Sequence, residues 1–279
     1  MGTPKRERQK ANRQQRLEDL ARQARTSKRK RTGIYVLLVP LAALALSGVV
    51  WLVKRGDDGA ATATSTTVDP LAPTTTLTPL PSTIAGAALT GETPCPAADG
   101  SSARTTTFAE PPPNCIDAAK TYTAVVTTNK GAFTIDLQPD LAPLTVNNFV
   151  VLARYHYFDS TICHRAIPGF AVQCGDPTGT GSGGPGYEFA DELPAAGSYK
   201  VGSIAMANSG ANTNGSQFFV ITGDRGAALP PSYTLFGEVT DGLDTTVPTL
   251  DALGNIDQAA NGVPPLEQII VETVAITET

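Results

Sequence analysis

Histidine is scarce in this chain of 279 residues, which contains only His156 and His164. Zinc sites combine cysteine and histidine at short intervals, whereas the four cysteines form C-x19-C and C-x10-C spacings that suit such a site poorly. Ser209 and Ser216 have no base close to them in the sequence, so a serine hydrolase triad is not indicated. We therefore expect no metal and no cofactor, and we interpret both histidines as packed or surface residues.

A glycine-rich stretch is a second candidate motif. Gly179–Gly184 reads G-T-G-S-G-G, which satisfies the G-x-G-x-x-G pattern of dinucleotide-binding sites. That pattern requires a helix directly after it, and Pro185-Gly186 interrupts the chain at once. We interpret the stretch as a surface loop that borders a groove.

Basic residues are concentrated at the start of the chain. Residues 1–55 hold 14 Lys and Arg against 3 Asp and Glu, which leaves 7 and 23 of the chain's 21 and 26 for the remainder. The net charges of these two parts, +11 and −16, add up to the −5 of the whole chain. The modest total therefore conceals a basic head and an acidic body.

An uncharged apolar stretch, Gly33–Val53, follows this head. Its 21 residues would span about 30 Å as a helix, the thickness of a bilayer core. Lys28–Arg31 stand directly before it, so the positive-inside rule predicts a single-pass anchor in the cell membrane, with a cytoplasmic N-terminus and everything after Arg55 outside. The alternative is a signal peptide cleaved near Ala61–Ala63, but the apolar run is longer than a signal sequence needs.

The composition divides the chain into five parts. We expect a basic cytoplasmic tail over 1–32 that orients the span at 33–53 rather than binding nucleic acid. A Thr/Pro/Ala-rich disordered linker covers 54–94, a disulfide-tied extension covers 95–120, and the globular domain covers 121–279.

The four cysteines all lie on the predicted outer side, where disulfides persist. Of the three possible connectivities we favour Cys95 with Cys115 and Cys163 with Cys174. The second pair depends on the turn at Pro168-Gly169. A two-residue turn sets Cys163 opposite Cys174, whereas a three-residue turn sets Arg165 opposite Gln173 and moves the cysteines out of line.

The body reads as mostly β-structure. Strands are predicted over 122–127 and 132–137 as a hairpin, with a closing strand over 268–276. Helices are predicted from Pro143 to Arg154 and around 246–253. Many strands with two helices indicate a mainly β fold in the form of a closed antiparallel barrel capped at its ends.

Two stretches carry the functional signal. Cys163–Asp176 reads C-H-R-A-I-P-G-F-A-V-Q-C-G-D, and its apolar runs around Pro168-Gly169 predict a hairpin that presents Arg165 beside Phe170 and Gln173. Met206–Phe219 reads M-A-N-S-G-A-N-T-N-G-S-Q-F-F, in which small and amide residues precede two phenylalanines. This combination suits a groove that binds peptide backbone and one apolar side chain.

Together these stretches closely resemble the H-R-x-I-P-G-F-x-x-Q-x-G-D and M-A-N-x-G-x-x-T-N-G-S-Q-F-F motifs of the cyclophilin-type peptidyl-prolyl cis-trans isomerases. The resemblance extends from about Tyr122 to the C-terminus, and it implies an eight-stranded barrel with two helices. With the anchor, we expect a bacterial, membrane-anchored, extracytoplasmic member of that family, acting as a monomeric domain on proline-containing unfolded or secreted polypeptides.

The resemblance also implies roles for individual residues. The catalytic set is Arg165, Phe170, Gln173, Asn208 and Phe219, and the substrate-binding set is Ala171, Ala207, Ser209, Gln217, Leu229 and Tyr233. Ala171, Tyr233 and Ala228 depart from the commonest eukaryotic pattern of Met, His and Trp, so we expect turnover with weakened cyclosporin binding. The alternatives are a non-catalytic peptide-binding chaperone and a structural envelope protein.

Overall fold

The computed structural model describes residues 85–117, 119–257 and 259–279. The basic tail, the predicted span at 33–53 and most of the predicted linker lie outside these residues. Within the described ranges, no helix combines the length and the apolar character that crossing a bilayer requires.

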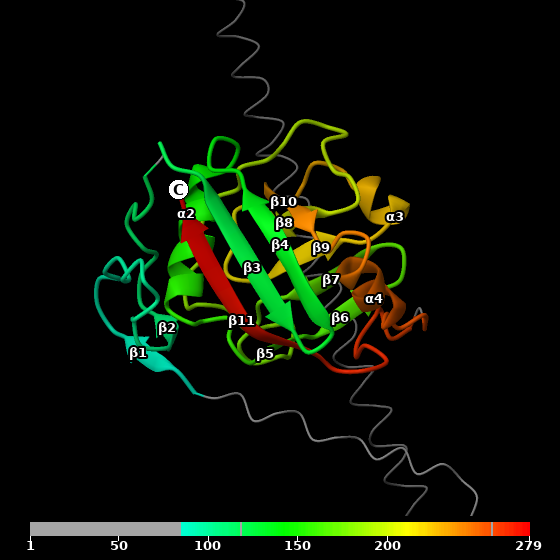
Figure 1. Ribbon diagram of the computed structural model, residues 1–279, viewed down its shortest axis with the longest axis horizontal. Helices are drawn as coiled ribbons and strands as arrows, with labels where there is room; N and C mark the ends of the chain where they lie inside the picture. Colours follow the sequence, from blue (N-terminus) through cyan, green and yellow to red (C-terminus); the bar gives the residue numbers. More distant parts are fainter. Residues whose placement is uncertain (1–84, 118, 258) are drawn as a thin grey trace, which may run out of the picture. The chain divides into compact units, whose positions relative to one another are not determined.

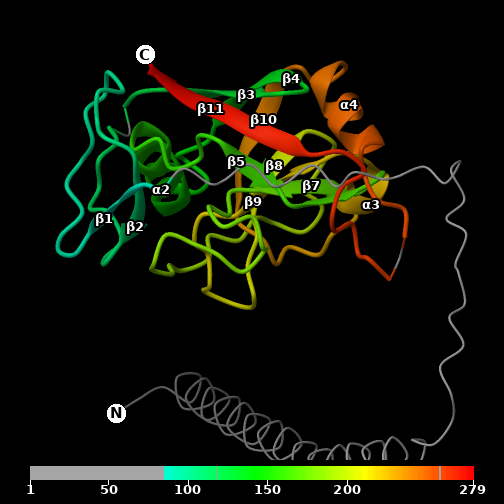
Figure 2. The same ribbon diagram turned by 90° about the horizontal axis from the view of Figure 1, so that it is seen from below.

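Nine antiparallel strands form the body of the molecule (Figures 1 and 2). They are β3 (Tyr122–Thr128), β4 (Gly131–Leu137), β5 (Thr161–Cys163), β6 (Arg165–Ile167), β7 (Ala171–Cys174), β8 (Ser203–Met206), β9 (Phe218–Ile221), β10 (Leu235–Asp241) and β11 (Ile269–Glu278). Their order in the sheet is β5-β11-β3-β4-β10-β8-β9-β7-β6. The first and last strands of this order are consecutive in the chain, so the sheet curls into a nearly closed barrel.

The count of eight strands implied by the family resemblance was wrong, and one reason is that the chain forms two short strands, separated at His164, before the turn at Pro168-Gly169. Before this residue, β5 pairs with β11, and after it β6 pairs with β7. His164 is only 5% exposed and stands where the chain changes its partner. The break therefore brings the two ends of the sheet together.

Among the described residues, both helices predicted for the body are present, and a short third one accompanies them. α2 (Pro143–Arg154) has the predicted bounds, and Pro143 suits its first turn because the proline φ is already helical. α4 (Thr246–Ala252) ends one residue before the predicted limit. The unpredicted α3 (Asp224–Ala227) has four residues, too few for a helical period in the sequence. In both views α2 lies at one side of the barrel and α4 at the other (Figures 1 and 2).

Two apolar clusters fill the interior. The larger one contains Phe149 of α2, whose ring centroid lies 5.0 Å from that of Phe158 and 5.4 Å from that of Phe218. The smaller one lies under the motif residues and is built from Ala171, Tyr199, Ala205, Phe219, Ile221 and Leu235. β9 supplies both clusters, since Phe218 and Phe219 point to opposite faces of the strand.

An extension before the barrel is ordered from its first described residues. β1 (Ala87–Leu89) and β2 (Thr105–Phe108) pair in parallel, and the predicted Cys95–Cys115 disulfide ties the segment together. β1 lies inside the range 54–94 that the sequence assigned to a disordered linker, so the predicted boundary at residue 95 was too late. With only three residues, β1 is too short to be recognised as a strand from the sequence pattern.

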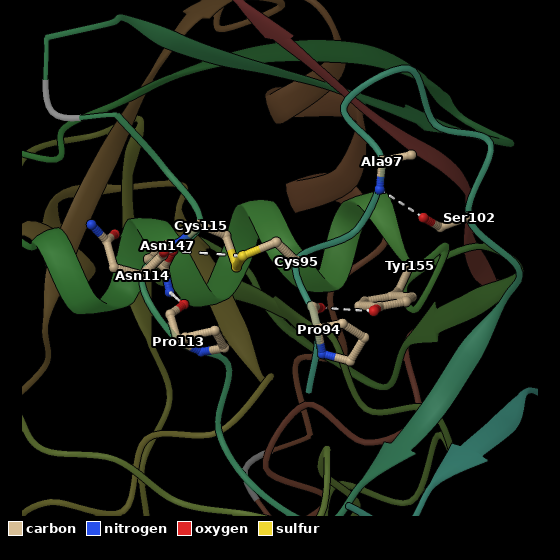
Figure 3. Close-up of a disulfide and its surroundings, with 9 residues drawn as sticks. All are labelled: Pro94, Cys95, Ala97, Ser102, Pro113, Asn114, Cys115, Asn147 and Tyr155. Carbon is tan, nitrogen blue, oxygen red and sulfur yellow. Dashed lines mark hydrogen bonds between the residues drawn. A yellow bond between two sulfur atoms is a disulfide. The ribbon is translucent and has the colours of Figure 1, made fainter. Parts of the chain in front are cut away.

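Helix α2 is the surface on which this extension docks (Figure 3). Asn147 accepts a 2.7 Å hydrogen bond from the Cys115 backbone N–H and donates a 2.9 Å one to the Pro113 carbonyl. At the end of the helix the Tyr155 hydroxyl donates to the Pro94 carbonyl at 2.8 Å. The disulfide and these bonds hold the extension at the α2 side, away from α3 and α4 (Figure 1).

Candidate active site

The β6–β7 hairpin carries the first motif in the register that a three-residue turn predicts. Arg165 lies opposite Gln173 and Ile167 opposite Ala171. The Cys163–Cys174 disulfide joins the end of β5 to the end of β7, so the diagonal placement that this register gives the cysteines is compatible with the bond. The bridge therefore joins the strand ends directly beside both Arg165 and Gln173.

Arg165 is half-buried and held by three hydrogen bonds. Its Nε donates to the Asn261 carbonyl at 3.0 Å, its Nη2 to Asn261 Oδ1 at 3.1 Å, and its Nη1 to Gln173 Oε1 at 3.4 Å. Burial lowers the pKa of the guanidinium from its ordinary value, while the neighbouring Tyr233 opposes that shift. The sequence analysis did not identify Asn261, which holds Arg165 from 96 positions along the chain.

Amide side chains continue from Arg165 in one direction. Gln173 Nε2 donates to Gln217 Oε1 at 2.8 Å, and Gln217 Nε2 donates to the Gly183 carbonyl at 2.9 Å. Each amide therefore has its oxygen and nitrogen assigned by its neighbours. The chain of bonds links the guanidinium to the glycine-rich loop.

The glycine-rich loop is anchored by Asp176, which is fully buried. Its carboxylate accepts hydrogen bonds from the backbone N–H groups of Thr178, Gly181 and Gly183, and from the Thr178 hydroxyl. These bonds lower the pKa of Asp176 in spite of its burial. As predicted, the stretch is a loop at the edge of a groove rather than the start of a helix.

This groove has a volume of about 630 Å³. The predicted residues Gln173, Ala207, Asn208, Ser209 and Gln217 line it together with Gly181–Gly184 of the loop. The Asn208 side chain is fixed by a 2.9 Å hydrogen bond to the Ser232 carbonyl. Residues of the second motif and of the glycine-rich loop thus line the same groove.

The apolar residues of the prediction form a separate patch beside the groove. Phe170, Ala207, Leu229 and Tyr233 are half-buried and pack on the smaller apolar cluster. Ala171 and Phe219 lie mostly beneath them, with exposed fractions of 3% and 6%, and the Phe219 ring meets Tyr233 edge to face at 5.4 Å. Ala207 belongs to both surfaces, so groove and patch are continuous there.

Arg165 stands at the junction of these surfaces. Its Cζ lies 5.8 Å from the centroid of the Phe170 ring, within the range of a cation–π contact. Through Gln173 it also reaches the groove. A fixed cation, an apolar patch and a polar groove therefore meet within one hairpin and its neighbours.

Comparison with known proteins identifies the family to which this chain belongs. The model of the family described as "Cyclophilin type peptidyl-prolyl cis-trans isomerase/CLD" matches residues 123–276, which is more than half of the chain. The chain belongs to this family. The barrel is accordingly a cyclophilin domain, and both motifs lie inside the matched range.

Known relatives share the cyclophilin domain and differ in the rest. "Peptidyl-prolyl cis-trans isomerase B" of Streptomyces anulatus is 40% identical over 169 residues, covering 55% of this chain and 95% of the relative. "Peptidyl-prolyl cis-trans isomerase-like 2" of Cryptococcus neoformans is 42% identical over 166 residues, 57% of this chain and only 28% of the relative. The chain thus spans about a quarter of that longer protein.

A solved structure agrees with the same range. A Cryptosporidium parvum cyclophilin, crystallised in the presence of the dipeptide Ala-Pro, superimposes with a TM-score of 0.50 at 33% identity. The match covers 56% of this chain and 98% of that one. The match therefore takes in nearly all of that cyclophilin and a little over half of this chain.

Proposed function

We propose that this protein accelerates the cis–trans rotation of X-Pro peptide bonds by a non-covalent mechanism. The obstacle to that rotation is amide resonance, a barrier of about 18–20 kcal/mol. No bond is broken, so no nucleophile is needed. What is needed is a site that binds the twisted amide better than the planar one.

Arg165 is the group best suited to this task. A guanidinium carries five N–H donors, and three of those on Arg165 are engaged by Asn261 and Gln173. Two remain for the substrate. In the twisted state the prolyl nitrogen regains its lone pair, so a donor held beside it stabilises that state selectively.

The patch and the groove would divide the rest of the substrate. Phe170, Leu229 and Tyr233, with Phe219 and Ala171 beneath them, offer an apolar seat for the proline ring. Gln173 and Asn208 would bond the adjacent backbone, and Ala207, Ser209 and Gln217 would line its path. The Ala-Pro dipeptide in the Cryptosporidium structure supports proline-containing peptides as the substrate class.

The observation that carries the proposal is the bonded pair of Arg165 and Gln173 at the edge of the groove. We expect Arg165→Ala in the full-length protein to lower kcat/KM by about 100- to 1,000-fold, as removal of a preorganised donor does in other enzymes. A proline-peptide assay in detergent solution measures this. Lys120→Ala, which removes an exposed cation bonded to Glu278, is the control and should retain full activity.

Equal, near-background rates for the wild type and Arg165→Ala would reject the enzyme. They would favour the alternative, a chaperone that uses the groove of about 630 Å³ only to hold unfolded chains. Peptide binding without turnover would identify that case.

We also propose that the cyclophilin domain acts as a monomer outside the cell membrane, held by an anchor at residues 33–53. Two disulfides support an oxidising compartment. The charge-free stretch and the basic residues before it support the anchor and its orientation. Clients would then be secreted or surface polypeptides.

A further inference from the structure

A second hollow, of about 310 Å³, lies next to Arg165 and shares no lining residue with the groove. Ile167 of β6 forms part of its wall, two residues after Arg165. Asn261 also lines it, and Asn261 is the residue whose carbonyl and side chain hold Arg165. A peptide that crosses Arg165 with one flank in the groove therefore brings its other flank to this hollow.

Arg225, which lines the hollow, provides a guanidinium group. The Arg225 guanidinium lies 5.9 Å from the centroid of the Phe170 ring, and the Arg165 guanidinium lies 5.8 Å from the same ring. Arg225 is exposed. Among the described residues it forms neither an ion pair nor a hydrogen bond, whereas Arg165 is fixed by three.

Two acidic side chains lie near Arg225, and neither forms an ion pair with it among the described residues. Asp257 also lines the hollow, but its Oδ1 accepts a 2.9 Å bond from the Ala259 N–H within its own turn. Asp224 precedes Arg225 in α3 and is exposed to solvent. Arg165 and Arg225 thus place two guanidinium groups beside the Phe170 ring, and Arg225 lines the hollow next to the residues proposed to bind the proline.

An apolar side chain completes the lining. Ile256 is 82% exposed, the highest fraction among the large apolar residues of the described chain. A side chain that fits here would combine a terminal negative charge for Arg225 with methylene groups for Ile256 and Ile167. Glutamate meets both requirements, and aspartate meets the first.

We propose that this hollow is a substrate subsite that prefers an acidic residue, on the flank of the proline opposite to the flank bound in the groove. Arg225 is its specificity-determining residue. The inference rests on the proposed isomerase function and narrows its substrates to X-Pro sites with an acidic neighbour on one side.

The test compares the full-length protein on Ala-Pro peptides that differ at one position. Peptides carry Glu, Gln or Lys at each of two positions before and two positions after the Ala-Pro pair, and exchange NMR measures kcat/KM without a coupled protease. On one flank only, we expect the wild type to favour Glu over Gln by about two- to fivefold at low salt, as an exposed ion pair allows. Salt near 1 M should remove the preference.

Charge reversal identifies the residue. In Arg225→Gln the ratio of kcat/KM between the Glu and Gln peptides should fall to about one. In Arg225→Glu the preference should invert, so that the Lys peptide has the highest kcat/KM. Lys200→Glu makes the same change in net charge at an exposed residue paired with Glu238, and should leave the ratio as in the wild type.

Each outcome decides. Activity on every peptide with no charge preference on either flank overturns the subsite and leaves the isomerase standing. A Glu preference that persists in Arg225→Glu overturns the role of Arg225. If the wild type accelerates none of the peptides, the isomerase function fails and the subsite fails with it.

Discussion

At the scale of single residues, the orientation of Arg165 depends on Asn261. Asn261 has a φ of 50°, a left-handed conformation that glycine tolerates and alanine does not. Asn261→Gly therefore removes only the Oδ1 acceptor of the 3.1 Å bond. Because bonds to charged groups contribute about 1.5–3 kcal/mol, we expect kcat to fall about 10- to 150-fold while KM changes little.

The control for this position is Asn261→Asp. It keeps the acceptor oxygen and should recover most of the activity, which a purely structural role of the loop would not explain. The contrary result is a Gly variant as active as the wild type. Steady-state kinetics on a single Ala-Pro peptide distinguish the two.

Sequence alone could predict part of this site. Arg165, Gln173 and Gln217 stand in two contiguous motifs, and the structure joins them by hydrogen bonds as the hairpin register requires. Asn261 stands in a turn whose letters predict only a turn. Asn261 contacts Arg165 because the segment before β11 folds back against β6. No local sequence pattern predicts this tertiary contact.

At the scale of elements, His156 fastens the extension to the barrel. Its Nδ1 lies 2.9 Å from the Asp159 carboxylate and its Nε2 lies 2.8 Å from the Gly100 carbonyl. Both partners accept, so only the doubly protonated ring donates to both. The hydrogen bond to Gly100, ahead of the Asp159 contacts, raises the pKa of His156.

The sign of the pH effect follows. The folded pKa of His156 lies above its unfolded value. The contacts of His156 with Asp159 and Gly100 therefore stabilise the folded protein fully below about pH 6.5, and this contribution is lost as pH rises through the folded pKa. The side chain is 37% exposed, so solvent limits the effect to at most about 1 kcal/mol. Urea unfolding at pH 5.5 and 8.5 should show a larger gap between wild type and His156→Gln at the lower pH. An equal difference in unfolding free energy at both pH values would contradict this role of the protonated His156.

The elements themselves were predictable where they are long. The hairpin of β3 and β4, helix α2 and strand β11 follow from alternation or helical spacing over at least seven residues each. The short strands β1 and β5 carry no such signal, whereas β6 was predicted through its hairpin with β7. The pairing of β1 and β5 is decided by tertiary contacts, which is why the extension began earlier and the barrel held one strand more than expected.

At the scale of the whole molecule, the disulfides and the predicted anchor both favour a location of the cyclophilin domain outside the cell membrane. Both disulfides lie within the described residues: Cys95–Cys115 is in the extension that docks on α2, and Cys163–Cys174 is close to Arg165. In intact cells we expect all four cysteines to resist a membrane-impermeant alkylating reagent, and the more accessible pair, Cys95 and Cys115, to react with it after an impermeant reductant, whereas Cys163 and Cys174 are buried. Mass spectrometry of the full-length protein counts the labels.

Neutralising Lys28–Arg31 supplies the matched variant, because the positive-inside rule makes these residues orient the predicted span. In that variant a larger share of the chains should insert with the cyclophilin domain in the cytoplasm. There the reducing pool keeps thiols free and the impermeant reagent does not reach them. Four free thiols in the wild-type protein would overturn both the outer location and the proposed class of clients, since secreted chains would never meet the groove.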